Sequence, residues 1–325
     1  MKLKKFYHKV IEVGIANDLR EPKEIKRTLK LEKEKYEKLS EDEKEFYDPD
    51  RLFNPFADTR ILNGDPETDI KKAIVGIDMQ AGEILLTYLL NRDKKENIDL
   101  IISHHPEGHA LAQLYDVMKL QAEIMASHGV SISVAEQLMD KRIVEIERRL
   151  LPANHTRAVD TAMLLGLPMM CIHTPADNCV ASYLTKIFEK KKPKTLKDIM
   201  DILKDIPEYR KAMKIQSPPK IVNGSEKNKC GKIIVDMTGG TEGTKDIFEK
   251  YANSGISTLV GMHFSENHLE NAKKANLNMV VAGHVSSDTL GLNLLFDEIE
   301  KEEKLEFVST AGFERIRRPK KRKER

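Results

Sequence analysis

From about residue 70 onward, short apolar runs alternate with segments whose apolar residues recur at helical spacing. The helical segments are Ala81–Leu90, Leu111–Ala126 and Ala135–Leu150. The runs of strand length are Lys72–Asp78, Ile98–Ser103, Gly129–Val134, Leu167–His173, Lys232–Asp236, Ile256–Met262, Leu277–Ala282 and Leu305–Ser309. This alternation is typical of βαβ units and a largely parallel sheet. We therefore predict an α/β fold.

The same pattern divides the chain into five parts. Residues 1–60 are dense in Lys and Glu after Glu21 and predict a charged helical arm on the surface. The other parts are a first α/β lobe over 61–180, a helical connector over 181–224, a second α/β lobe over 225–313 and a basic tail over 314–325.

Composition and charge narrow the class of protein. The 325 residues are 40% hydrophobic and 33% charged, which suits a globular core with a wet surface. The last eleven residues hold eight basic side chains and one acidic one, so the rest of the chain carries −5 of the total charge of +2. A mildly acidic body argues against nucleic-acid binding except through the tail, which we interpret as a solubilising extension.

The cysteines and the lengths of the apolar runs indicate the cellular compartment in which the protein is expected. Cys171, Cys179 and Cys230 form neither an even disulfide set nor a CxxC zinc pattern, which favours reduced thiols. No apolar run approaches the roughly 20 residues that span a bilayer, and the first residues lack the features of a signal peptide. We expect a cytoplasmic protein without membrane contact.

Histidines end three of the predicted strands. His104 and His105 follow Ile98–Ile102, while His173 and His284 end two later strands, each with an aspartate four residues on, Asp177 and Asp288. In open α/β sheets, ligands bind in the crevice at the carboxyl ends of the strands. We therefore expect these side chains to converge on one pocket.

Adjacent imidazoles set a constraint on any metal site. In extended backbone, His104 and His105 point to opposite faces, so they reach two neighbouring ions more easily than one. A carboxylate can bridge such a pair, and three imidazoles with two carboxylates suit Zn, Mn, Fe, Ni or Co rather than Ca or Mg. The alternative is that each histidine forms its own hydrogen bonds at its own strand end and binds no metal.

The segments LIISHHP, HTPAD and GHVSSD, in this order and at these separations, resemble the signatures of the NIF-three-like family, also described as GTP cyclohydrolase I type 2. The resemblance covers residues 55–313. It implies two similar α/β lobes with a dinuclear metal site between them, and a toroidal homohexamer.

Residue by residue, the resemblance implies His105 and Asp177 on one ion, His104 and His284 on the second, and Asp288 bridging both. The family usually has Glu where this chain has Asp288. His173 matches a position that faces a ligand or the substrate rather than an ion, and we assign it as a candidate proton carrier.

The family label implies a metal-dependent hydrolase or cyclohydrolase acting on a nucleotide such as GTP. Two alternatives stay open, a metal-holding or metal-trafficking protein without catalysis and a regulator that binds a partner. Three further features have two interpretations each. The loop Gly239–Thr244 is an anion-binding loop or a plain turn, His263 and His268 line the pocket or cap a helix, and Asp78 faces the cleft or caps a helix.

Overall fold

The computed structural model describes residues 1–318 and has two separate sheets. The first has the order β1-β4-β3-β2-β9 and the second β5-β8-β7-β6. The strands are β1 (Arg60–Asn63), β2 (Lys72–Gly76), β3 (Leu100–Ser103), β4 (Met169–Cys171), β5 (Lys220–Asn223), β6 (Lys232–Asp236), β7 (Ile256–Gly261), β8 (Asn278–Val281) and β9 (Glu306–Ser309). The predicted α/β fold with two mostly parallel sheets is confirmed.

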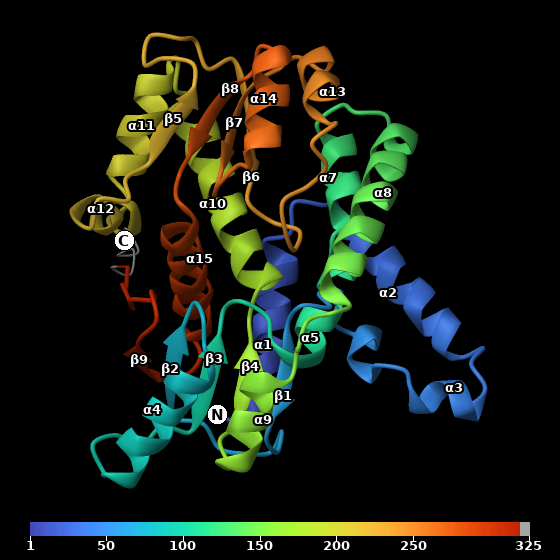
Figure 1. Ribbon diagram of the computed structural model, residues 1–325, viewed down its shortest axis with the longest axis vertical. Helices are drawn as coiled ribbons and strands as arrows, with labels where there is room; N and C mark the ends of the chain where they lie inside the picture. The colour runs from blue at the N-terminus through green and yellow to red at the C-terminus, as the bar shows by residue number, and fades with distance from the viewer. Residues whose placement is uncertain (319–325) are drawn as a thin grey trace, which may run out of the picture.

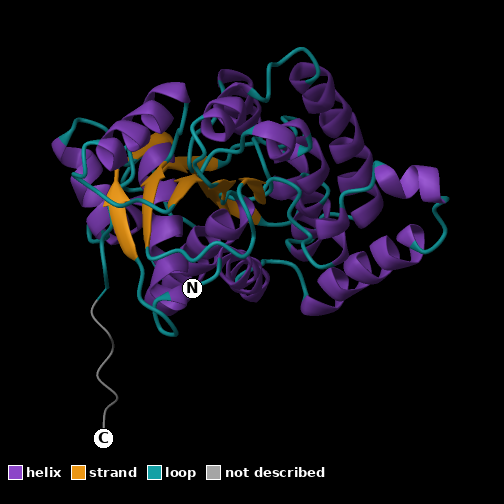
Figure 2. Cartoon of the chain, turned by 90° about the horizontal axis from the view of Figure 1, so that it is seen from below, coloured by secondary structure: helices purple, strands orange, loops and turns teal. Residues whose placement is uncertain are grey.

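The strands lie within a shell of helices, which Figure 2 shows in purple around orange strands. The helices are α1 (Leu3–Ala16), α2 (Pro22–Tyr36), α3 (Glu41–Glu45), the 3-10 helix η1 (Pro49–Leu52), α4 (Ala81–Arg92), α5 (Gly108–Ala112), α6 (Leu114–Val117), α7 (Leu120–Ser127), α8 (Ile132–Leu150), α9 (Arg157–Leu164), α10 (Thr174–Lys191), α11 (Leu196–Lys204), α12 (Pro207–Lys214), α13 (Phe248–Asn253), α14 (Glu266–Lys274) and α15 (His284–Ile299). Among the described residues, no helix is both long and apolar enough to cross a bilayer.

The two sheets follow one plan. In each, the first strand of the lobe pairs antiparallel with the strand at one end of the parallel run, β1 with β4 and β5 with β8. Both pairings carry a bulge that ends at an asparagine, and Asn63 and Asn223 each donate a side-chain hydrogen bond to a backbone carbonyl that precedes the partner strand, over 2.7 and 2.6 Å. The lobes are therefore two copies of one supersecondary unit.

Helices α10 and α15 pack against each other between the two sheets (Figure 1). The contact is close because α15 carries Gly291 where the helices touch. A Cβ at this position would lie 2.4 Å from the carbonyl oxygen of Ala176 on α10. Since Asp177 follows Ala176 and Asp288 lies one turn before Gly291, this approach brings the two carboxylates together.

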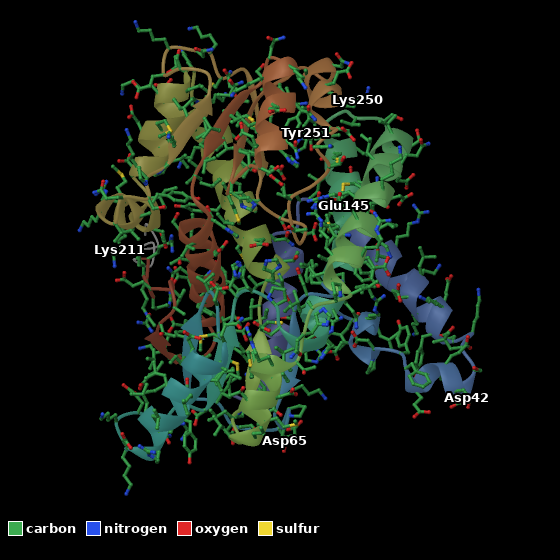
Figure 3. The ribbon with its side chains drawn as sticks, viewed as in Figure 1. Asp42, Asp65, Glu145, Lys211, Lys250 and Tyr251 are labelled. Carbon is green, nitrogen blue, oxygen red and sulfur yellow. The ribbon has the colours of Figure 1, made fainter. Side chains whose placement is uncertain are left out.

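The amino-terminal segment differs from the expected arm over residues 1–60. Leu3, Phe6 and Val10 recur at helical spacing on α1 and are completely buried in the core of the first lobe. Lys and Glu dominate α2 and α3 instead, and these helices extend away from the body (Figure 1), with Asp42 at the outer end (Figure 3). Three apolar residues at helical spacing are enough to bury one face of α1, although basic residues surround them in the sequence.

Two strand predictions need correction. Residues 129–134 are not a strand, because α8 begins at Ile132 and its buried positions Ala135, Met139, Ile143 and Ile146 continue a helical period. The strand β9, expected in the second lobe, instead pairs with β2 in the first sheet. Strand β5, conversely, comes from the expected connector and joins the second sheet.

The basic tail begins as an anchored segment. Arg315 pairs with Asp297 and Glu300 over 2.5 and 2.7 Å, and Arg318 pairs with the buried Glu208 over 2.8 Å. The first residues of the expected extension over 314–325 are therefore bound to the folded part of the chain. Residues 319–325, which carry the rest of its charge, lie outside the described residues.

Candidate metal centre

His104 and His105 lie directly after β3, where their backbone amides donate to the carbonyls of Gly76 and Ile77. Nδ1 of His104 lies 2.8 Å from the carbonyl oxygen of Ile172. A carbonyl oxygen only accepts, so this Nδ1 carries the proton and Nε2 keeps its lone pair. Burial, with a smaller effect from His173, lowers the pKa of His104 to about 3, so the ring stays neutral and able to bind a metal.

His105 is oriented by a carboxylate. Its Nδ1 lies 2.7 Å from Oδ1 of Asp78, which leaves Nε2 to face the centre. Hydrogen bonds of this kind fix the ring orientation of metal-binding histidines. Asp78 thus supports a candidate ligand, and the cap of α4 is made by Gln80 and Glu83 instead. The expectation that Asp78 caps this helix is wrong.

Asp288, which is 1% exposed, lies between the candidate ligands. Its Oδ1 lies 3.5 Å from Nε2 of His104, and its Oδ2 lies 3.7 Å from Nε2 of both His105 and His284. Asp177 completes the arrangement, with Oδ1 3.5 Å from Nε2 of His104. The structure therefore brings together all five side chains that the sequence indicated.

These atoms form two groups, each able to hold a metal ion, that share Asp288. One contains His104, Asp177 and Asp288, and the other contains His105, His284 and Asp288. The expected pairing, His105 with Asp177 and His104 with His284, is therefore reversed. Because His104 and His105 are adjacent, the sequence predicts only that their imidazoles point in opposite directions. The direction of β3 relative to α10 and α15 decides which of them lies beside Asp177.

The ligand atoms lack partners of their own. Nε2 of His104, Oδ1 of Asp177 and both side-chain oxygens of Asp288 are buried without a hydrogen bond. Burial raises the pKa of Asp177 well above its usual range and also raises that of Asp288. Unpaired buried polar groups cost free energy, and divalent cations held by the two groups would together satisfy all four atoms. The donor set therefore fits borderline divalent transition ions.

His173 lies just before α10 and forms a third group with His104 and His105. Its Nδ1 lies 2.8 Å from Oδ2 of the buried Asp58, which also accepts a hydrogen bond from Thr174 over 2.6 Å. Burial opposes the charge of His173, but Asp177 and Asp58 outweigh it and raise its pKa to about 9. No pattern in the sequence pointed to Asp58, which lies in an irregular segment before β1.

A cavity of about 280 Å³ opens beside these side chains. Its polar lining includes His105, His173, Asp177, His263, His284 and Asp288. His263 thus lines the pocket, whereas His268 contacts Ser265 and the carbonyl of Gly243. The loop Gly239–Thr244 forms part of the wall, but it does not begin a helix, since α13 starts only at Phe248. It is a turn without a helix dipole behind it.

Comparison with known proteins places the chain in a family. The model of the family Duf34/NIF3 (NGG1p interacting factor 3) matches residues 49–314. The crystal structure of a NIF3 superfamily protein from Sphaerobacter thermophilus has 26% identity and a TM-score of 0.68, over 79% of this chain and 92% of that one. Reduced HcgD from Methanocaldococcus jannaschii gives 15% identity and a TM-score of 0.47, over 77% and 87%.

A comparison with curated proteins gave no match. The family model nevertheless spans both lobes and every candidate ligand. The chain therefore belongs to the Duf34/NIF3 family.

Proposed function

We propose that this protein binds two divalent transition-metal ions, one in each of the two groups, with Asp288 bridging them. This proposal rests on the orientation of the Asp288 carboxylate, whose two oxygens face different groups of histidines. One oxygen faces His104 and the other faces His105 and His284, and both are buried without a hydrogen bond. A single ion would leave one of these oxygens unsatisfied.

We further propose that the centre is that of a metal-dependent hydrolase. Divalent ions held there would polarise a substrate oxygen and lower the pKa of a coordinated water. His173 lines the same cavity and is held by Asp58, so it is placed to carry a proton between the centre and a substrate. A proton carrier needs such an orienting partner, because a freely rotating ring would lose its geometry.

The alternative is a metal-holding or metal-trafficking protein, whose ions do no chemistry. A purely structural metal site has its coordination closed by protein ligands, whereas catalytic sites keep an open position. Here the candidate ligands line a cavity large enough for part of a small molecule, which favours catalysis. The nucleotide substrate, with GTP as its example, rests on the family resemblance.

The test is product analysis with metal-reconstituted protein. Zinc-, manganese- and iron-loaded samples would be incubated with GTP and with amide and phosphoester substrates, and products identified by mass spectrometry. We expect turnover that His173→Gln lowers about 100-fold, within the usual range for losing a general acid–base group, while metal content is kept. Two bound ions without turnover of any substrate would favour the metal-holding alternative.

We also propose that the chain forms a closed homo-oligomer, a hexamer by the family resemblance. The projection formed by α2 and α3 carries Leu31 and Phe46, which are 54% and 86% exposed. Closed symmetry is the usual outcome for soluble homo-oligomers. Light scattering at micromolar concentration should give a multiple of 37.1 kDa, and the mass of a single chain would contradict the proposal.

A further inference from the structure

The cavity beside the metal centre has a second acidic region in its wall. Asp236 ends β6 and Glu242 lies in the loop that follows, and both side chains line the cavity. Neither belongs to the groups whose ligand atoms lie within 4.8 Å of one another. The apolar residues of the cavity lining include Leu111, Leu114, Met237, Met262 and Phe264. Two carboxylates outside the candidate metal groups therefore line the cavity.

No lysine or arginine among the described residues lines this cavity. Oε1 of Glu242 accepts a hydrogen bond from the amide of Ser265 over 2.6 Å, which leaves its other oxygen free. Desolvation in the cavity, together with nearby Glu242, raises the pKa of Asp236 to about 6. Asp236 is thus mostly ionised at pH 7.5, and no lysine or arginine of the described residues forms an ion pair with either carboxylate. Nδ1 of His268 lies 3.4 Å from Oε1 of Glu242, but burial lowers the pKa of this histidine.

The acidic wall is held in place by the first lobe. Nε2 of Gln121 on α7 donates to the carbonyls of Gly239 and Thr241, over 2.7 and 2.8 Å. Arg142 on α8 donates to the carbonyl of Glu242 through Nε and Nη2, over 3.1 and 3.0 Å. A wall fixed at three backbone carbonyls loses little freedom when a ligand binds, so its charges are preorganised.

We propose that the substrate of this centre carries an oxygen ligand at one end and a cationic nitrogen group, such as an amidine, guanidine or amine, at the other. The oxygen would reach the ions near the buried, unpartnered Asp288, and the nitrogen group would donate to Asp236 and Glu242. This substrate class rests on the proposed hydrolase function. An anionic group at the acidic wall would meet two unneutralised carboxylates, so a triphosphate does not fit there.

A matched pair of probes tests the proposal. 4-Carbamoylbenzamidine and terephthalamide have the same ring and the same amide oxygen, and differ only in the amidinium that replaces one amide. Calorimetric titration of zinc-loaded protein at pH 7.5 should give about tenfold tighter binding of the amidine, since charge-assisted hydrogen bonds are roughly twice as strong as neutral ones. In the double variant Asp236→Asn/Glu242→Gln, the ratio should fall to about one.

The single variant Asp236→Asn removes one charge with the smallest change in shape and should give an intermediate ratio, so the test survives if the double variant does not fold. Equal binding of both probes by the wild type, no binding of the amidine at millimolar concentration, or an unchanged ratio in the variants would overturn the proposal. Titrations of metal-free protein separate the two claims. If zinc never binds, the proposed function fails, whereas the amidine preference should persist because it comes from the wall.

Discussion

Nε2 of His104 lies 3.5 Å from Oδ1 of Asp288, although one residue follows a strand of the first sheet and the other lies on the last helix. Both atoms are buried and neither has a hydrogen-bond partner. Two such atoms would not face each other in a stable core unless a third group satisfied both. A divalent ion between them is the simplest group that does so.

Removal of the shared carboxylate should affect both ions. Replacement of a residue that merely supports a ligand typically lowers metal affinity 10–100-fold, so Asp288→Asn should weaken both binding events by at least about 100-fold. Asp177→Asn, the matched control, should weaken only one, because its Oδ1 faces only the His104 group. Zinc titration by calorimetry distinguishes them. Retention of two tight sites in Asp288→Asn would show that Asp288 is not a bridge.

The orienting hydrogen bond of His105 gives a second prediction. Asp78→Asn should lower the affinity of the His105 group by roughly 10–100-fold and leave the His104 group unchanged. Asp93→Asn, a change on the same lobe at the end of α4, serves as the control. Competition with a fluorescent zinc chelator measures both. Equal loss from both groups would mean that Asp78 acts on the whole site.

The close contact of α10 and α15 predicts that Gly291→Ala separates the two carboxylates. The added methyl would meet backbone at 2.4 Å, and overpacking of this kind costs about 1–3 kcal/mol. Metal affinity should fall as well, because Asp177 and Asp288 move apart. Gly82→Ala is the matched control, since a Cβ there meets nothing within 4 Å. It should stabilise α4 by up to about 1 kcal/mol. Denaturant unfolding compares the two variants, and a Gly291→Ala protein as stable as wild type would contradict the argument.

The position of α1 predicts a large effect of its core residues. Phe6→Ala should lower the free energy of unfolding by about 3–5 kcal/mol, because Phe6 is completely buried. Phe46→Ala should change it by less than about 0.5 kcal/mol, because Phe46 is 86% exposed on the projection. Chemical denaturation of both variants provides the measurement. A small effect of Phe6→Ala would restore the interpretation of residues 1–60 as a surface arm.

The apolar patterns of the sequence predicted those features of the site that depend on neighbouring residues along the chain. The apolar runs before His104, His173 and His284 marked strand ends, and the structure places these side chains at one centre. The sequence could not show that His104 lies with Asp177, because that pairing depends on how β3 is oriented toward two helices. Asp58 escaped prediction for a related reason, since only the folded chain brings it to His173.

The errors share a physical cause. Apolar and polar residues alternate over residues 129–134 as they do in a strand. Four buried residues farther along the chain recur at helical spacing, so the helix α8 forms from Ile132 onward instead. The run that forms β9 has no feature that assigns it to either sheet, and in the folded chain it pairs with β2 of the first sheet. Tertiary packing, rather than propensity, decided both outcomes.

The number of ions per chain decides whether the centre is dinuclear. Protein stripped with a chelator, then reloaded with zinc, manganese or iron in turn, would be measured by elemental analysis and by mass spectrometry under native conditions. With the best-bound metal, we expect two ions per chain in the wild type and fewer than one in Asp288→Asn. One ion per chain in the wild type, or none, would contradict it.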